Sequence, residues 1–185
     1  AARTLFGDQG YGGTTLQEIA DRAGVAVQTI YFTFGNKRAL LKEIIDVAVA
    51  GDDAPIATMD RPWFRAALAA ETAPEQLRRH VRGAREVLDR VAEITEVVRT
   101  AITVEPELAD LWSADPRLIV QSAAAERLVA KPGVGADVTR EYAADLLFGV
   151  LSPEFYLTFV RDRGWAPEQW EELAYQILRS RLCAA

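Results

Sequence analysis

Residues 14–42 have the sequence TTLQEIADRAGVAVQTIYFTFGNKRALLK, and this stretch decides the fold of the N-terminal part of the chain. Thr15 followed three residues later by Glu18 predicts a helix start, because the hydroxyl and the carboxylate together satisfy free backbone N–H groups. Gly24 ends that helix, and a second short helix is expected from about residue 26 to residue 32. The connection 24–26 has the length that crosses two helices at the angle used by DNA-binding helix-turn-helix modules.

Two further helices are expected on either side of this pair. An earlier helix carries Leu5 and Phe6 and is predicted to stop at residues 7–13, where four glycines oppose helix formation. The chain begins without a capping residue, so we expect the first turns of that helix to be missing. On the other side, Asn36 is predicted to cap a helix that continues to Val49.

The second helix of the pair has the side chains of a DNA-reading helix. A glutamine such as Gln28 can pair with an adenine edge through two hydrogen bonds, and Thr29 and Tyr31 can donate to phosphate. Val25, Ile30 and Phe34 are expected to anchor the helix. The alternative is that the polar residues form an ordinary solvated helix face. The predicted DNA contacts are Thr15, Val27, Gln28, Thr29, Tyr31, Phe32, Thr33 and Lys37.

The charge distribution permits this function although the chain has a net charge of −6. Residues 1–47 hold five basic and five acidic side chains, so this segment is neutral and residues 48–185 carry the whole −6. Within residues 22–42 every charge is positive. Lys37 and Arg38 stand at a helix start, where a positive charge is unfavourable unless an anion is present, and this favours phosphate contact by Lys37.

The rest of the chain shows helical spacing of apolar residues and no alternating strand pattern, which predicts an all-α fold. A long helix is expected over about 74–103, and Glu105-Pro106 is predicted to open another that runs to Val129. Asp137 is the expected cap of the next helix, and Ser152-Pro153 interrupts it. A last amphipathic helix is expected from Glu168 to Leu182.

The N-terminal pattern resembles the TetR (tetracycline-repressor) family of transcriptional regulators. The resemblance covers about residues 1–47, with two departures: Ala26 stands where a capping Ser is usual, and Gln28 where a small residue is common. It implies a DNA-binding domain over 1–47 and a helical ligand-binding and dimerisation domain over 48–185. The matching residues are Phe6, Gly10, Tyr11, Thr14, Thr15, Ile19, Ala20, Ala23, Gly24, Val25, Thr29, Ile30, Tyr31, Phe34 and Lys37.

The resemblance also implies a ligand pocket and a dimer face in the second domain, the latter from the last two helices, about 138–162 and 167–182. His80 is the single histidine and fits a structural role as well as a ligand contact, and the aromatic residues fit a plain core as well as a pocket. The pocket candidates are Trp63, Phe64, His80, Trp112, Phe148 and Phe155. The dimer candidates are Leu147, Leu151, Phe159, Trp170, Leu173 and Ile177.

The sequence contains no pattern that indicates an enzyme. One histidine and one cysteine, Cys183, make neither a nucleophile–base pair nor a metal-ligand set, and no cofactor fingerprint is present, so we expect no metal and no cofactor. No apolar run is long enough to predict a membrane span, and a cytoplasmic location is expected.

We therefore expect a ligand-responsive transcriptional regulator, in first place a repressor. It would bind a palindromic double-stranded DNA operator as a homodimer and be released by an apolar or aromatic small molecule. The alternative is an all-α protein that binds a small molecule or a partner protein without touching DNA.

Overall fold

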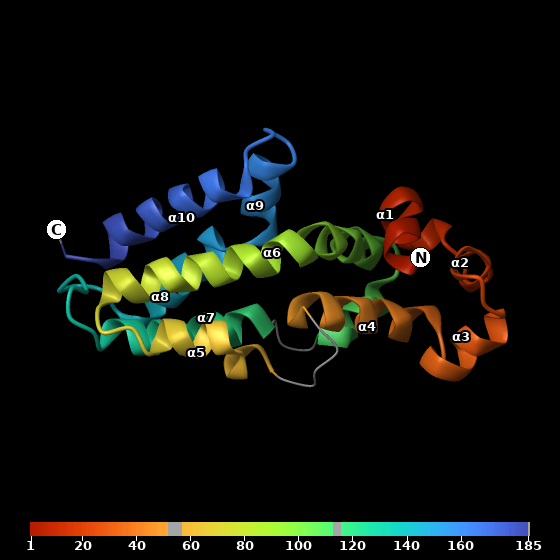
Figure 1. Cartoon of the computed structure of the whole chain (residues 1–185), viewed down its shortest axis with the longest axis horizontal. Coiled ribbons are helices and arrows are strands. Elements are labelled where there is room, and N and C mark those ends of the chain that lie inside the picture. The colour runs from red at the N-terminus through yellow and green to blue at the C-terminus, as the bar shows by residue number, and fades with distance from the viewer. Residues whose placement is uncertain (52–56, 113–115, 185) are drawn as a thin grey trace. The chain divides into compact units, whose positions relative to one another are not determined.

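The computed structural model describes residues 1–51, 57–112 and 116–184, without the side chains of 111 and 112. Within these ranges the regular secondary structure is helical, as predicted, and the β-type pairing is one isolated backbone bridge between Val134 and Cys183 (Figure 1). The elements are α1 (Ala2–Gly13), α2 (Leu16–Ala23), α3 (Val27–Phe34), α4 (Lys37–Ala50), η1 (Thr58–Asp60), α5 (Pro62–Leu68), α6 (Ala73–Val104), η2 (Pro106–Trp112), α7 (Pro116–Val129), α8 (Arg140–Val150), α9 (Pro153–Val160) and α10 (Pro167–Leu182).

The chain forms two compact units. The first unit consists of Ala1–Asp53 and Val91–Ser113, and the second of Ala54–Arg90 and Ala114–Ala185. Helix α6 contributes to both, with residues 73–90 in the second unit and 91–104 in the first. The first unit therefore combines the segment predicted as the DNA-binding domain with a part of the chain that is distant in sequence.

Local capping signals set the helix ends in the first unit, as predicted. The Thr15 hydroxyl accepts from Glu18 N (3.2 Å) and the Glu18 carboxylate accepts from Thr15 N (2.8 Å). Gly24 ends α2 at φ 70°, a left-handed conformation that glycine adopts without steric cost. Asn36 caps α4 by accepting from Ala39 N (2.8 Å).

The first helix ends within the glycine-rich segment 7–13, as predicted. Helix α1 continues through Gly7, is broken at Gly10 (φ 74°, ψ 167°) and ends at Gly13. The buried Thr14 hydroxyl lies close to both Gly10 O (2.8 Å) and Leu5 O (3.2 Å). Side-chain bonding of these carbonyls compensates for a poor helix-forming composition.

Two predicted helix boundaries in the later part of the chain also need correction. Thr139, not Asp137, caps α8, because its hydroxyl accepts from Tyr142 N (3.1 Å). The helix predicted from residue 105 to residue 129 is divided into η2 and α7, and both begin with a proline. The predicted interruption at Ser152-Pro153 is confirmed, since Ser152 caps α9 and Pro153 is its first residue.

Helices α6, α9 and α10 of the second unit are joined by a charged network. Arg85 of α6 donates from Nε to Glu171 of α10 (2.8 Å) and pairs with Asp89 one turn along α6. The hydroxyl of Tyr156, on α9, donates to the same Asp89, and burial raises the pKa of that tyrosine. Arg85 thus bonds one residue on its own helix and one on another helix.

The stretch Arg140–Val160, which contains α8 and α9, is apolar and partly buried within the chain. The expectation that no apolar run is long enough for a membrane span is corrected here, because the length and composition of this stretch would suffice for one; 39% of its most apolar window is buried within the chain. Part of its apolar surface is therefore left uncovered by this chain.

Candidate nucleic-acid interface

Helix α3 turns one face inward and presents the other to solvent. Ile30 is buried and Phe34 is half-buried, so these two residues anchor the helix as predicted. Val25 was also predicted to be an anchor but is exposed, because the turn places it outside the packed face. The exposed face carries Gln28, Thr29, Tyr31, Phe32 and Thr33, and Val27 is half-buried at the first turn.

The exposure of the two aromatic residues is unusual. Phe32 is 94% exposed and Tyr31 is 54% exposed, although aromatic side chains of this size usually gain free energy by burial. Helix α3 contains no acidic residue, and Ala26 at its N-cap makes no side-chain hydrogen bond. The helix thus offers apolar, polar and uncapped backbone groups on one solvent-facing surface, without a negative charge that would repel phosphate.

Thr15 and Glu18 mark the start of the neighbouring helix α2. The Thr15 hydroxyl lies 2.8 Å from Glu18 Oε2 and donates to it, and hydrogen bonding to Thr15 lowers the pKa of the exposed Glu18 carboxyl. Thr15 itself is exposed. Its backbone and side chain are held in a fixed capping geometry at the start of α2.

Lys37 has an internal role that the sequence did not predict. Its Nζ donates to Tyr11 O (2.9 Å) and Thr14 O (3.1 Å) and lies 4.2 Å from the centroid of the Tyr11 ring. These contacts tie the start of α4 to the connection between α1 and α2. Two of the three ammonium hydrogens are thereby engaged within the chain. Sequence reasoning missed this because two of the partners are backbone carbonyls, which leave no mark in the residue pattern.

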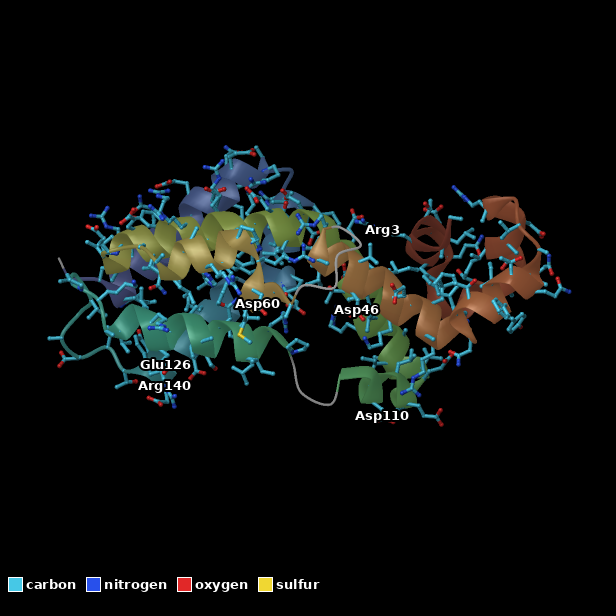
Figure 2. All side chains as sticks on the ribbon, turned by 60° about the horizontal axis from the view of Figure 1, so that its bottom comes forward. Arg3, Asp46, Asp60, Asp110, Glu126 and Arg140 are labelled. Carbon is cyan, nitrogen blue, oxygen red and sulfur yellow. The ribbon has the colours of Figure 1, made fainter. Side chains whose placement is uncertain are left out.

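The remaining positive charges of the segment lie on α2 and α4. Arg22 is exposed in the last turn of α2, and Arg38 is half-buried beside the N-terminus of α4. Lys42 forms an exposed ion pair with Asp46, which is labelled in Figure 2. An exposed pair of this kind contributes little to stability and leaves the lysine accessible.

Comparison with known proteins assigns the N-terminal segment. The family model described as "Bacterial regulatory proteins, tetR family" matches residues 1–44. These residues are a TetR-family domain. Over 52 residues the chain is 39% identical to a curated protein from Bacillus subtilis (strain 168), described as the HTH-type transcriptional regulator YezE. That stretch is 28% of this chain and about a quarter (27%) of the relative's length.

The whole chain has the fold of solved TetR-family regulators. A regulator assigned to this family from Mesorhizobium loti superposes with a TM-score of 0.65 at 16% identity, covering 99% of this chain and 93% of the other. PfmR, a TetR-family regulator from Thermus thermophilus, superposes with a TM-score of 0.61 at 23% identity, covering 97% and 95%. The all-α architecture with an N-terminal TetR-type domain is thus confirmed, and the relatives named here are all described as transcriptional regulators.

Three of the predicted pocket residues come together in the second unit of this TetR-type fold. The ring of His80 on α6 lies 5.7 Å from the Phe64 ring and 6.0 Å from the Trp63 ring, centroid to centroid. Phe64 and His80 are buried, whereas Trp63, beside them on α5, is half-buried. Helices α5 and α6 therefore bring these side chains into one cluster.

The other predicted pocket residues do not join this cluster in any contact that the structure gives. Phe148 on α8 lies under the guanidinium of Arg117, 4.7 Å from ring centroid to Cζ. Phe155 on α9 packs against Phe159 (5.1 Å) and Trp170 (6.4 Å). Trp112 ends η2, and its side chain lies outside the described part of the chain.

The predicted dimer residues divide into two groups. Leu147, Leu151 and Trp170 are buried in the chain's own core, so their side chains present no surface to a second copy. Their apolar character reflects packing between helices of one chain, a cause that sequence periodicity does not separate from dimerisation. Half-buried positions are occupied by Phe159, Leu173 and Ile177.

Proposed function

We propose that this chain is a ligand-responsive transcriptional repressor that binds a palindromic DNA operator as a homodimer through α3. The observation that carries the proposal is the exposed face of α3, with Gln28, Thr29, Tyr31 and Phe32 directed to solvent on a TetR-type domain. A helix of this kind fits the major groove of B-DNA.

Each exposed side chain has a partner of suitable chemistry in the groove. Gln28 fits the N6 and N7 edge of adenine, and Phe32 fits the methyl group of thymine. Thr29, Tyr31 and Thr15 are suited to phosphate oxygens, which set the position of the helix but carry no sequence information. The third ammonium hydrogen of Lys37 can add a phosphate contact without loss of its two internal bonds.

For the dimer we propose a face on α8, α9 and α10. The apolar stretch Arg140–Val160 is only partly buried within one chain, and Phe159, Leu173 and Ile177 are half-buried. A second copy would cover this apolar surface in a four-helix arrangement. Two copies would then present their α3 helices to half-sites about 34–36 Å apart, one turn of DNA.

The effector would bind in the second unit and change operator affinity from there. Helix α6 carries His80 in the second unit and supplies residues 91–104 to the first, so one helix belongs to both units. If the effector binds two conformations of the chain with different affinity, a helix shared by both units can transmit that preference to the unit that contains α3. A regulator of this type acts where the DNA is, which is the cytoplasm in bacteria.

The proposal is tested by an electrophoretic mobility shift on the DNA upstream of the gene and its neighbours. We expect retardation that weakens steeply with salt, because phosphate contacts release counterions. Gln28→Ala should change the preferred operator sequence and weaken binding about tenfold or more, the effect of losing one bidentate base contact. The control is Gln9→Ala, an exposed glutamine on α1, which should leave binding unchanged.

Two results would contradict the proposal. Absence of a shift at low salt on any of these fragments would favour a helical protein that binds a small molecule or a partner without DNA. A shift that Gln28→Ala and Gln9→Ala weaken equally would exclude α3 as the reading helix.

A further inference from the structure

The second unit contains a cluster of polar side chains inside its core. Gln76 and His80, one turn apart on α6, are each 1% exposed, and Gln121 on α7 is 7% exposed. Gln76 donates from Nε2 to Ala124 O (2.8 Å), and His80 Nε2 lies 2.7 Å from Gln121 Oε1. The other hydrogen-bonding atoms, Gln76 Oε1 and His80 Nδ1, are buried and have no partner among the described residues.

Both unpartnered atoms are acceptors. The Ala124 carbonyl can only accept, so it fixes the amide of Gln76 with Nε2 towards it and leaves Oε1 as an open acceptor. Burial lowers the pKa of His80, so the ring is neutral. Because Nε2 faces the Gln121 oxygen, it carries the single ring proton, and Nδ1 is left with a lone pair. A buried acceptor without a donor costs about 1–3 kcal/mol, so both atoms favour a donor supplied from outside the protein.

Aromatic rings lie beside the histidine of this cluster. The rings of Phe64 and Trp63 lie beside the His80 ring, and their own centroids are 5.5 Å apart in an edge-to-face arrangement. Trp63 lies directly on the backbone of α6 at Gly83, where a Cβ would be 2.1 Å from the indole Cε3. Trp63 is half-buried, so this aromatic group is partly exposed to solvent.

From this arrangement we infer that the effector is an uncharged aromatic molecule that donates hydrogen bonds to Gln76 Oε1 and His80 Nδ1. The inference rests on the proposed function and specifies the effector class for it. Hydroxyl or amine hydrogens on a ring would reach the acceptors, while the ring packs against Phe64 and Trp63.

The same arrangement disfavours an anionic effector. A carboxylate would bring its negative charge to two lone pairs in a buried site, where unpaired charge is costly. Arg61 is also buried at the start of α5, but it already has an interaction of its own. A ligand without donors would leave both acceptors unsatisfied.

The single histidine makes a direct test possible. In the chain labelled with 15N-histidine, both ring-nitrogen signals belong to His80. Three probes are titrated without DNA: resorcinol, which has two donors, 1,3-dimethoxybenzene, which has the same ring and no donor, and benzoate, an anion. We expect resorcinol to shift the Nδ1 signal in a saturable manner with little change at Nε2. The other two probes should cause no saturable shift of the Nδ1 signal.

Variants complete the test. Gln76→Leu removes one acceptor at similar volume and should weaken resorcinol binding about fivefold to tenfold, the effect of one buried hydrogen bond. The control, Gln176→Leu, changes an exposed glutamine on α10 and should leave binding unchanged. Equal responses to all three probes, no response to resorcinol, or a stronger response to benzoate would each overturn the inference. Since no DNA is present, failure here is distinct from failure of operator binding.

Discussion

Glutamine and aromatic side chains occur together in two regions of this chain, and their exposure to solvent is opposite in the two regions. On α3, Gln28 is exposed, and Phe32 is 94% exposed. In the second unit, Gln76 and Phe64 are each 1% exposed. The residue types are the same, but one set faces solvent and the other is enclosed by neighbouring helices.

The difference shows what each region can recognise. Exposed glutamine and aromatic groups retain their hydration until a partner with a large surface displaces it, as DNA does. Enclosed groups are already desolvated, so an unmet acceptor such as His80 Nδ1 discriminates between small molecules by their donors.

The contrast is sharpest for two phenylalanines. Phe64→Ala should lower the free energy of unfolding by about 3–5 kcal/mol, because it leaves a cavity in the core. Phe32→Ala should change it by no more than about 0.5 kcal/mol, because the side chain is exposed. Both are measured by urea unfolding. Equal losses would mean that α3 is not the exposed helix described above.

The packing of Trp63 on Gly83 can be tested by adding one methyl group. Gly83→Ala should cost about 1–3 kcal/mol of stability, because the new Cβ would meet the indole ring at 2.1 Å. Gly149→Ala on α8 is the matched control, since nothing described lies within 4 Å of its Cβ position. That change should stabilise the protein by up to about 1 kcal/mol through helix propensity.

A double variant separates the clash from any general effect at this position. In a Trp63→Ala background the ring is gone, so Gly83→Ala should become neutral or stabilising. Thermal unfolding of the four proteins gives the coupling energy. Independent, additive effects would show that the indole does not lie on α6.

The buried histidine predicts a pH dependence of stability. Burial lowers the pKa of His80 below its ordinary value of 6.5, so the unfolded chain takes up a proton at a higher pH than the folded chain. Its contribution to stability is complete above about pH 6.5 and is lost as the pH falls below that value. The slope from this group is at most about 1.4 kcal/mol per pH unit.

His80→Gln removes that proton uptake while keeping a donor for Gln121. Urea unfolding between pH 7.5 and 5 should show a shallower decline for the variant than for the unchanged chain. Carboxylates contribute equally to both proteins, so the difference isolates the histidine. Parallel curves would mean that His80 is not buried in its neutral form.

The smallest predicted effect concerns the start of α3. Ala26 makes no capping hydrogen bond, so Ala26→Ser should stabilise the protein by about 0.5–1 kcal/mol. Thr15→Ala is the reverse control on α2 and should cost about 1 kcal/mol, because it removes a cap that is present. If Ala26→Ser has no effect, α3 is held by the burial of Ile30 rather than limited by its missing cap.

Signals confined to a few neighbouring residues were predictable. The capping box at Thr15, the helix end at Gly24, the cap at Asn36 and the proline interruption at Ser152-Pro153 were all expected, because each depends on hydrogen bonds or dihedral angles within a few residues. The position of the break in α1, at Gly10 rather than at Gly7, was not predictable, because the Thr14 hydroxyl bonds the carbonyls of Leu5 and Gly10. That compensation depends on how the chain folds back.

The sequence by itself therefore determined the helical class and the helix-turn-helix, since local periodicity and capping encode them. Only the tertiary structure decided that Lys37 binds backbone carbonyls, that Leu147 and Trp170 belong to the chain's own core, and that Gln76 and His80 are left with open acceptors. Each of these depends on which distant backbone or side chain lies beside a residue, and helical spacing alone does not specify the neighbour.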